Sequence, residues 1–260
     1  RTWYNGTYNY TSRPLMTEEN YVDFRDALHY QLSAIMFKNC NHVRLDNCIA
    51  QYCRAGFAFS NCHYSCITNC KTMNTWADGI TFSWHSSYCY VSNHYCEMVN
   101  DDQYSAWGYG GAPQTNHIYF NNCHSHNSWG ALACFEGAQY CWITNSTSDN
   151  CNYTPLKGGY LTQSSGWKFG TECHYENCNI TMSNRVQPLA GTDNHLEMVM
   201  SNSTVVDRPT MYYKHVTIDG TAMTENYPLY WNTLNKLVIE DCKFINLLPY
   251  PSSNWLNNSS

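Results

Sequence analysis

Short segments in which hydrophobic and polar residues alternate recur along the chain, and each of them ends near an asparagine. The steps between the asparagines of five such segments are 22, 24, 29 and 23 residues. Alternation with a period of two predicts half-buried β-strands. The five segments are 43–48, 65–70, 89–94, 118–123 and 141–146, and their asparagines are Asn47, Asn69, Asn93, Asn122 and Asn145.

A second series of short hydrophobic segments follows the first, at 55–59, 78–82 and 129–133, and weaker copies occur at 174–178 and 237–242. Strands that recur with a period of 20–50 residues indicate a solenoid or a propeller. A propeller blade needs about 40 residues, and the leucine template of leucine-rich repeats is absent. The pattern therefore predicts an all-β, right-handed parallel β-helix with about 22–24 residues per coil, since such crossovers are nearly always right-handed.

No Pro/Ser-rich linker divides the chain, so we expect one β-helix domain over 1–260. We expect an irregular N-terminal cap at 1–35, regular coils at 36–185, and less regular coils and loops at 186–260. Segment 17–32 suits a short capping helix, and the glycine-rich 108–113 suits a loop. The chain starts at Arg1 and shows no signal peptide, so we expect a fragment of a longer chain.

Stacked coils place equivalent residues in columns. Asparagine at a recurrent turn tolerates the left-handed conformation and can bond to the next asparagine of its column. Cys40 with Cys62, and Cys48 with Cys70, are one coil apart. We interpret these cysteines as small buried hydrophobes rather than as disulfides. Zinc is not indicated, because no two CxxC pairs occur, and we predict no bound metal beyond a possible structural calcium.

Composition narrows the function. Charged residues make up 13% of the chain, against about 25% in an average domain. The net charge of −6 argues against a nucleic-acid partner. No apolar run approaches the ~20 residues of a membrane span, which argues against membrane insertion. The 22 Tyr, 9 Trp and 9 Phe exclude a disordered chain.

Cysteine and asparagine usage favours a secreted, extracellular or cell-surface glycoprotein. The chain holds 15 cysteines, and disulfide-permissive compartments tolerate such counts. Asn-X-Ser/Thr sites are glycan acceptors in secreted proteins. We expect glycans at several of Asn5, Asn9, Asn145, Asn152, Asn179 and Asn202; two further sites, Asn257 and Asn258, end the chain.

Two aspartates share one position of the repeat, and a third lies next to it in the sequence. Asp78 lies nine residues after Asn69, and Asp102 lies nine after Asn93, with Asp101 beside it. Stacked strands are ~4.8 Å apart, so we expect the three carboxylates to crowd one patch. Like charges raise one another's pKa, and a protonated carboxyl beside ionised ones is what glycosidic cleavage needs. Solvated turn aspartates and a calcium site are the alternatives.

Aromatic residues are dense around these aspartates, and aromatic faces pack against sugar rings. The candidate substrate-binding residues are Trp76, Trp84, Tyr104, Trp107 and Trp129, with Tyr109 nearby. Scattered aromatics can equally belong to the core. His124 and His126 fall in the next coil and could orient an acid or a substrate hydroxyl, although a structural role is the alternative.

Segments 74–80, 100–102 and 127–137 together resemble glycoside hydrolase family 87, the α-1,3-glucanases and mycodextranases. They resemble polygalacturonases more distantly, and the similarity covers about 36–150. The resemblance implies an extracellular, endo-acting hydrolase that inverts the anomeric centre, with Asp101 protonating the leaving oxygen while Asp78 and Asp102 activate water. It implies a polysaccharide partner and no organic cofactor. No Arg-X-Lys pair follows to bind a uronate, which favours a neutral α-glucan.

Two other functions remain open. A non-catalytic, glycosylated β-solenoid could serve as a structural or surface-fibre protein that self-assembles. A carbohydrate-binding or lyase β-helix would use the acidic cluster to hold calcium. The three aspartates discriminate these functions by their position: an open groove with tryptophan favours the hydrolase, and burial in a subunit contact favours the structural protein.

Overall fold

The computed structural model describes residues 33–75, 77–108, 114–128, 130–151, 155–159, 172–183, 196–197, 210–222, 229–230 and 234–246. The helix expected at 17–32 lies outside the described residues, as do the loop expected at 109–113 and most of the expected cap. Within the described ranges the secondary structure is all β, and no helix there could cross a membrane.

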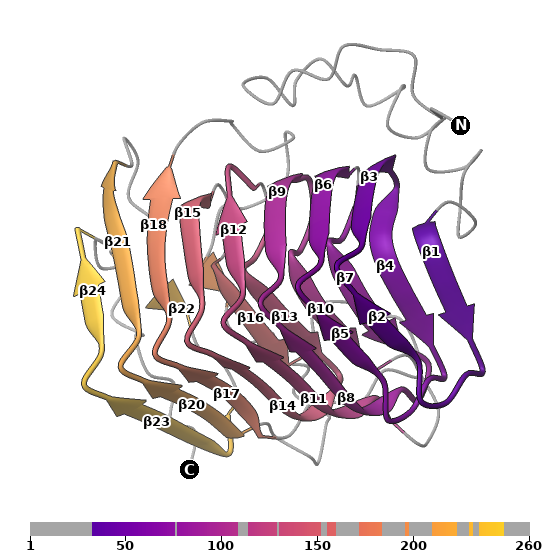
Figure 1. Cartoon of the computed structure of the whole chain (residues 1–260). Helices are drawn as coiled ribbons and strands as arrows, with labels where there is room; N and C mark the ends of the chain where they lie inside the picture. Colours follow the sequence, from indigo (N-terminus) through magenta and orange to yellow (C-terminus); the bar gives the residue numbers. More distant parts are fainter. Residues whose placement is uncertain are drawn as a thin grey trace, which may run out of the picture.

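Three long parallel sheets form the body of the molecule (Figure 1). Sheet 1 has the order β1 (Ser33–Lys38), β4 (Ala55–Ser60), β7 (Ile80–Ser83), β10 (Tyr104–Trp107), β13 (Ala133–Glu136) and β16 (Leu156–Gly159). Sheet 2 has the order β2 (Arg44–Asp46), β5 (Cys66–Thr68), β8 (Ser87–Ser92), β11 (Asn116–Asn121), β14 (Gln139–Thr144), β17 (Cys173–Glu176), β20 (Thr210–Lys214) and β23 (Lys236–Glu240).

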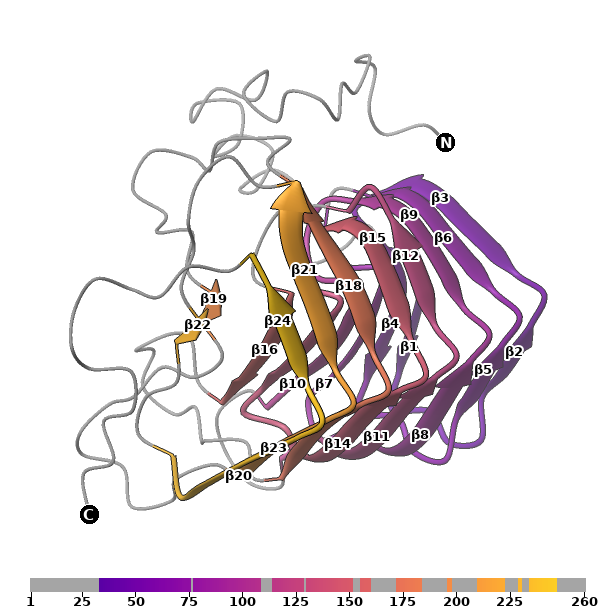
Figure 2. The ribbon, with the colours of Figure 1, turned by 90° about the vertical axis from the view of Figure 1, so that its left-hand side faces the viewer.

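Sheet 3 runs through the strands that follow those of sheet 2. Its order is β3 (Ile49–Cys53), β6 (Lys71–Thr75), β9 (Tyr95–Val99), β12 (His124–His126), β15 (Thr147–Cys151), β18 (Asn179–Ser183), β21 (Thr217–Ala222) and β24 (Lys243–Ile245). The short strands β19 (Leu196–Glu197) and β22 (Leu229–Tyr230) pair separately. Each regular coil thus gives one strand to each sheet, and the coils stack along one axis (Figure 2).

The register confirms the predicted right-handed parallel β-helix. Phe57 pairs with Ile80, Ile80 with Tyr104, and Tyr104 with Ala133. Every step joins residues one coil apart, and the longest of the three steps spans the expected 108–113 loop. Alternating side chains point inward and outward because successive Cβ atoms of a strand lie on opposite faces.

Aromatic rings stack from coil to coil inside the solenoid. The ring centroids of Phe37 and Phe59 are 5.3 Å apart, and those of Phe59 and Phe82 are 4.8 Å apart. Further along, the rings of Tyr175 and Tyr213 lie 5.0 Å apart. The spacing follows from the strand separation of about 4.8 Å, so the rings bury their faces against one another.

The repeat asparagines form one column at the turn between sheets 2 and 3, as predicted. Asn47, Asn69, Asn93, Asn122 and Asn145 all have a positive φ between 52° and 55°. The Asn122 amide donates to Asn93 Oδ1 at 2.7 Å, and the Asn93 amide donates to Asn69 Oδ1 at 3.2 Å. Asparagine suits this column because it tolerates the left-handed conformation and carries both a donor and an acceptor.

The cysteines largely follow the interpretation as small buried hydrophobes. Ten of the fifteen are buried, five are half-buried, and all are free thiols. Of the expected glycan acceptors, Asn145 and Asn179 are exposed, whereas Asn5, Asn9, Asn152 and Asn202 lie outside the described residues. The Asn145 amide donates to Asn121 Oδ1 at 2.8 Å.

Candidate active site

The three predicted aspartates come together at the N-terminal ends of neighbouring strands of sheet 1. Asp78 precedes β7 by two residues and Asp102 precedes β10 by two, and these strands pair in register. One carboxylate oxygen from each of Asp78, Asp101 and Asp102 lies within 4.8 Å of the others. The one-coil spacing in the sequence therefore produces the expected cluster.

Asp78 is held by two donors from β10. Ser105 Oγ donates to Asp78 Oδ2 at 2.9 Å, and Trp107 Nε1 donates to the same oxygen at 3.3 Å. Burial raises the pKa of the Asp78 carboxyl well above its usual range, and the charges of Asp101 and Asp102 raise it further. The two hydrogen bonds oppose that shift because they favour the ionised form.

Asp102 is buried and paired with a lysine from two coils further on. Its Oδ1 accepts the Ala131 backbone N–H at 2.9 Å and lies 2.9 Å from Lys157 Nζ. The Asp102 side chain is 0% exposed. Its Oδ2 has no partner among the described residues. A buried carboxylate needs a partner, and here both the Lys157 ammonium and the Ala131 N–H contact the same Asp102 oxygen.

A fourth carboxyl, that of Glu136, lies on the same face of sheet 1 as Ser105 and Trp107. Glu136 ends β13 and lies near Lys157, Asp102 and Asp101, whose charges act on it. Glu136 is buried, and its Oε1 has no partner among the described residues. Burial raises the pKa of its carboxyl to about 8. Glu136 and Lys157 were not identified from the sequence, because neither shares the repeat position of the aspartates.

A close backbone approach fixes the position of Asp101. Gln103 Nε2 donates to the backbone carbonyl of Asp101 at 3.3 Å and to that of Gly130 at 2.9 Å. A Cβ at position 130 would lie 2.3 Å from the Asp101 carbonyl carbon. Only glycine allows the next coil to pass this close.

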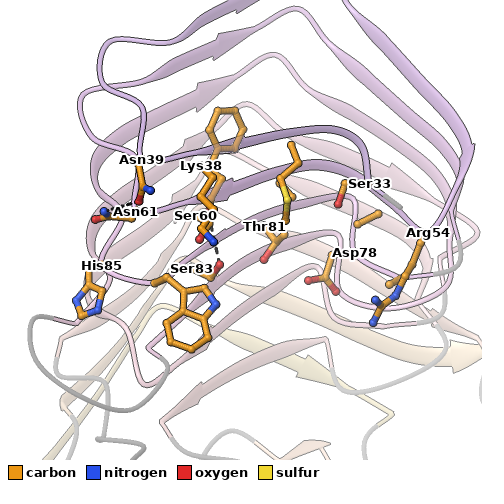
Figure 3. Close-up of a pocket in the computed structure, with 16 residues that line it drawn as sticks. Ser33, Lys38, Asn39, Arg54, Ser60, Asn61, Asp78, Thr81, Ser83 and His85 are labelled. Atoms are coloured by element: carbon orange, nitrogen blue, oxygen red, sulfur yellow. Dashed lines mark hydrogen bonds between the residues drawn. The ribbon is translucent and has the colours of Figure 1, made fainter. Parts of the chain in front are cut away.

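A groove of about 700 Å³ begins at Asp78 and crosses the outer face of β7, β4 and β1. Asp78 and Arg54 stand at one end and His85 at the other (Figure 3). Trp84 lines the groove and is 48% exposed. Both Trp84 and His85 have a positive φ, a strained conformation for bulky residues that recurs at ligand sites. His85 Nδ1 is buried without a partner among the described residues.

The other predicted residues divide into three groups. Trp107 joins the cluster through its bond to Asp78. Tyr104 was assigned wrongly, because it points into the core, is 0% exposed and donates to the backbone carbonyls of His94 and His124. Trp76, Tyr109 and Trp129 lie outside the described residues.

His124 and His126 do not line the groove. They belong to β12 in sheet 3, whereas the groove lies on sheet 1. The two ring nitrogens of His124 contact Thr147 Oγ1 at 2.8 Å and Asn122 Oδ1 at 3.2 Å. These two contacts join His124 to a neighbouring coil and to the asparagine turn, which is a structural role.

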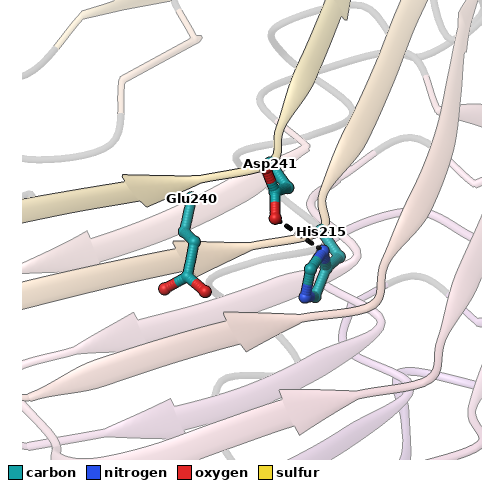
Figure 4. Close-up of side chains that lie close together, drawn as sticks. All are labelled: His215, Glu240 and Asp241. Carbon is teal, nitrogen blue, oxygen red and sulfur yellow. Dashed lines mark ion pairs between the residues drawn. The ribbon is translucent and has the colours of Figure 1, made fainter.

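Two side-chain groups have the donor atoms for a metal ion among the described residues. The aspartate cluster offers three oxygens, but the Lys157 ammonium bonded to Asp102 repels a cation. The second group, His215, Glu240 and Asp241, is exposed (Figure 4). There, Lys214 pairs with Glu240 at 3.2 Å, and His215 with Asp241 at 3.8 Å. The aspartate cluster therefore suits proton transfer better than metal binding.

Replacing Glu136 should flatten the pH dependence of stability. Its pKa is about 4.5 when unfolded and about 8 when folded, so between these values the unfolded chain binds fewer protons. The contribution of Glu136 to the free energy of unfolding is therefore fully present below pH 4.5. It is lost as pH rises toward 8, by at most about 1.4 kcal/mol per pH unit. Glu136→Gln should remove this slope in urea-unfolding measurements across that range.

The matched control is Asp149→Asn, at an exposed position of β15. It should leave the slope unchanged. An equal slope for the wild type and Glu136→Gln would mean that Glu136 ionises normally in the folded protein.

The chain is similar to several solved structures but matches no protein family. No protein-family model matches the chain, and no curated protein matches it. The Family 28 exopolygalacturonase of Yersinia enterocolitica superposes with a TM-score of 0.54 at 11% identity, covering 81% of this chain and 44% of that chain. A likeness at this identity shows the fold alone, which is the parallel β-helix.

Two further solved structures match less closely. The catalytic domain of a GH87 α-1,3-glucanase in complex with nigerose has a TM-score of 0.39 at 13% identity, covering 84% of this chain and 50% of that one. The A-module of a mannuronan C-5 epimerase from Azotobacter vinelandii has a TM-score of 0.44 at 11% identity, covering 80% and 57%. The chain thus spans about half the length of the structures it matches.

Proposed function

We propose that the protein is an extracellular, endo-acting glycoside hydrolase that cleaves a neutral α-glucan by inversion. One observation carries the proposal: Asp78, Asp101 and Asp102 gather with oxygens within 4.8 Å, and Asp78 lines the end of a groove that also holds an exposed tryptophan. The solved structure that superposes best by TM-score among those described is named an exopolygalacturonase, which supports a polysaccharide-cleaving β-helix.

The cluster suits acid-assisted bond cleavage because its three carboxyls cannot all ionise. Carboxylates this close share protons, and their titration belongs to the group rather than to one residue. The Lys157 ammonium is paired with Asp102, and two donors to Asp78 partly offset the rise in the pKa of its carboxyl that burial causes. We assign the shared proton to Asp101, which is half-buried and would protonate the leaving oxygen.

Asp78 and Asp102 then hold the attacking water. Each has one oxygen fixed by donors of the protein, so the other oxygen is available to water. The vacant Asp102 Oδ2 accepts one water proton and orients the lone pair toward the anomeric carbon. Water attack and departure of the leaving group proceed on opposite faces of the sugar, which inverts the anomeric configuration.

The carboxylate spacing also supports a second mechanism. Acid and base lie about 6.5–9.5 Å apart in inverting enzymes and about 5–5.5 Å apart in retaining ones. The nearest oxygens of this cluster, within 4.8 Å, are closer to the retaining distance. A double displacement through an aspartyl ester is therefore the alternative, and the anomer of the first product distinguishes the two.

The choice of substrate rests on the motif resemblance and the scarcity of lysine. The groove itself is lined by Lys38 and Arg54, whose charges suit a uronate carboxylate, so a pectin-type polymer is the second candidate. The test is reducing-end release from a panel of α-glucans, β-glucans and polygalacturonate. The control replaces all three aspartates by asparagine. Release from an α-glucan by the wild type alone supports the proposal, and no release from any polymer contradicts it.

Removing the groove tryptophan should weaken substrate binding without unfolding the protein. Trp84 is 48% exposed, and covering an apolar side chain with a ligand contributes about 25 cal/mol per Å² of apolar surface removed from water. Trp84→Ala should therefore raise KM by roughly several-fold to tenfold, with a melting temperature close to that of the wild type. Tyr64→Ala, at an exposed position of 56% outside the groove, is the control and should leave KM unchanged.

Secretion or surface display, with glycans on the exposed sequons, belongs to the same proposal. Its support is the number of cysteines and sequons. A non-catalytic surface-fibre solenoid that self-assembles is the alternative, and the single-domain organisation and the calcium site remain predictions. Intact mass before and after deglycosylation of the native protein tests the location: an unchanged mass contradicts it.

A further inference from the structure

The first two coils stack four thiols into two pairs. Cys40 lies one coil from Cys62, and Cys48 lies one coil from Cys70. The residues that flank them pair in the parallel ladders: Lys38 with Ser60, Asn41 with His63, Asp46 with Thr68, and Ile49 with Lys71. Partners in such a ladder are about 4.8 Å apart, within the range of about 4.4–6.8 Å that a disulfide allows between Cα atoms.

The two thiols of the first pair have the same orientation. Cys40 Sγ donates to the carbonyl of Lys38 at 3.3 Å, and Cys62 Sγ donates to that of Ser60 at 3.4 Å. Because Lys38 and Ser60 are register partners, the two sulfurs point in one direction from adjacent coils. The Cys40 side chain reaches that of Cys62.

The second pair repeats this arrangement. Cys48 Sγ donates to the carbonyl of Asp46 at 3.5 Å, and Cys70 Sγ donates to that of Thr68 at 3.1 Å. The backbone N–H of Cys48 also donates to Cys70 Sγ at 3.3 Å. The sulfur of Cys70 therefore lies against the main chain of Cys48.

A third stacked pair serves as an internal comparison. Cys141 and Cys173 are register partners, and both are 0% exposed. Cys40 and Cys48, by contrast, are half-buried. Register alone thus does not distinguish the pairs, but access of a small disulfide to one thiol of each pair does.

We propose that Cys40–Cys62 and Cys48–Cys70 are modification sites that a small disulfide, such as oxidised glutathione, converts to inter-coil disulfides. The thiolate of the half-buried cysteine attacks one glutathione sulfur, and one glutathione thiolate leaves. The stacked partner thiolate then attacks the cysteine sulfur of the mixed disulfide and releases the second glutathione. Each protein pair loses two protons and two electrons, and the two glutathiones take them up.

These bonds would fasten the end of the solenoid. Strands β1, β2 and β3 are the terminal strands of the three sheets, so the first coil has a stacking neighbour on one side only among the described strands. Each disulfide joins residues 22 positions apart, and closing such a loop disfavours the unfolded chain. The first coil would then separate from the second only after reduction. This inference does not depend on the proposed hydrolase.

Peptide mapping after oxidation tests the proposal. The whole chain is incubated with oxidised glutathione, denatured with an alkylating agent and digested without reduction. We expect Cys40 linked to Cys62 and Cys48 linked to Cys70, each with a loss of about 2 Da, and alkylated Cys141 and Cys173. Alkylation of all four thiols of the two pairs, or linkage in other pairs, would overturn it.

Thermal unfolding provides the second readout. Oxidation should raise the melting temperature by roughly 5 °C or more. The double variant Cys40→Ser, Cys48→Ser should fold but show no difference between its oxidised and reduced forms. Cys141→Ser, the matched control, should keep the full difference. An oxidation shift in the double variant equal to that of the wild type would also overturn the proposal.

Discussion

Asp101→Asn should abolish hydrolysis of the polysaccharide while leaving binding and the melting temperature close to those of the wild type. The amide resembles the acid in shape but cannot deliver a proton. General acid catalysis contributes about 10²–10⁴-fold, so kcat should fall at least about 100-fold. Asparagine is neutral, as is the protonated carboxyl assigned to Asp101, so the charge of the crowded cluster does not change and we expect no loss of stability.

The leaving group distinguishes the proton donor from the residues that hold water. In an activated aryl glycoside, such as a dinitrophenyl glucoside, the aryl oxide is a good leaving group and departs without protonation. Asp101→Asn should therefore retain most of the wild-type rate on that substrate. Asp78→Asn should be slow on both substrates, because its defect lies in the attacking water, and added azide should accelerate it.

The control for both variants is Asp149→Asn, an exposed carboxylate on sheet 3, which should keep full activity. Full polysaccharide activity in Asp101→Asn would exclude Asp101 as the acid. If instead Asp78→Asn is rescued by the aryl substrate and Asp101→Asn is not, the proton donor is Asp78. The raised pKa of the Asp78 carboxyl makes this the alternative that the experiment must exclude.

The second large effect concerns stability. Lys157→Met should lower the free energy of unfolding by about 3–5 kcal/mol, because it leaves the charge of Asp102 buried and unpaired. The Lys157 ammonium and the Asp102 carboxylate are 2.9 Å apart and almost fully buried. Urea unfolding at neutral pH measures the loss.

Two variants complete that test. The double variant Lys157→Met, Asp102→Asn should recover a large part of the lost stability, because the uncompensated charge is gone. Lys214→Met breaks a half-exposed pair with Glu240 and should change stability by only about 0–1 kcal/mol. Equal losses for Lys157→Met and Lys214→Met would show that the buried pair is not formed.

The fold could be predicted because a stacked solenoid repeats one local constraint in every coil. The turn needs a left-handed residue, and asparagine fulfils it at Asn69, Asn93 and Asn122. The same periodicity located the aspartates, because equivalent positions of adjacent coils must lie side by side. Asp78 and Asp102 share such a position, and the structure brings them together.

Periodicity alone did not determine which face a side chain occupies. Tyr104 pairs with Ile80, and Ile80 pairs with Phe57, so its column is hydrophobic and inward. Comparing these three residues would have placed Tyr104 in the core. The alternation then puts its neighbours Ser105 and Trp107 on the outer face, where both bond to Asp78.

Lys157 and Glu136 could not be predicted from spacing, because they follow the strand start rather than precede it. Lys157 is 55 residues from Asp102, and two coils of unequal length separate them. Their proximity depends on the register of β13 with β16. A single lysine in a chain with 14 basic residues carries no signal until the coils are aligned.

The anomeric configuration of the first product, followed by proton NMR on an α-linked glucan, is the most direct measurement. Hydrolysis by inversion predicts that β-anomer signals appear first and that the α-anomer grows only by mutarotation. The triple asparagine variant should give neither signal. Absence of any new anomeric signal with folded wild-type protein would contradict hydrolysis at Asp78, Asp101 and Asp102, and an α-anomer that appears first would contradict inversion.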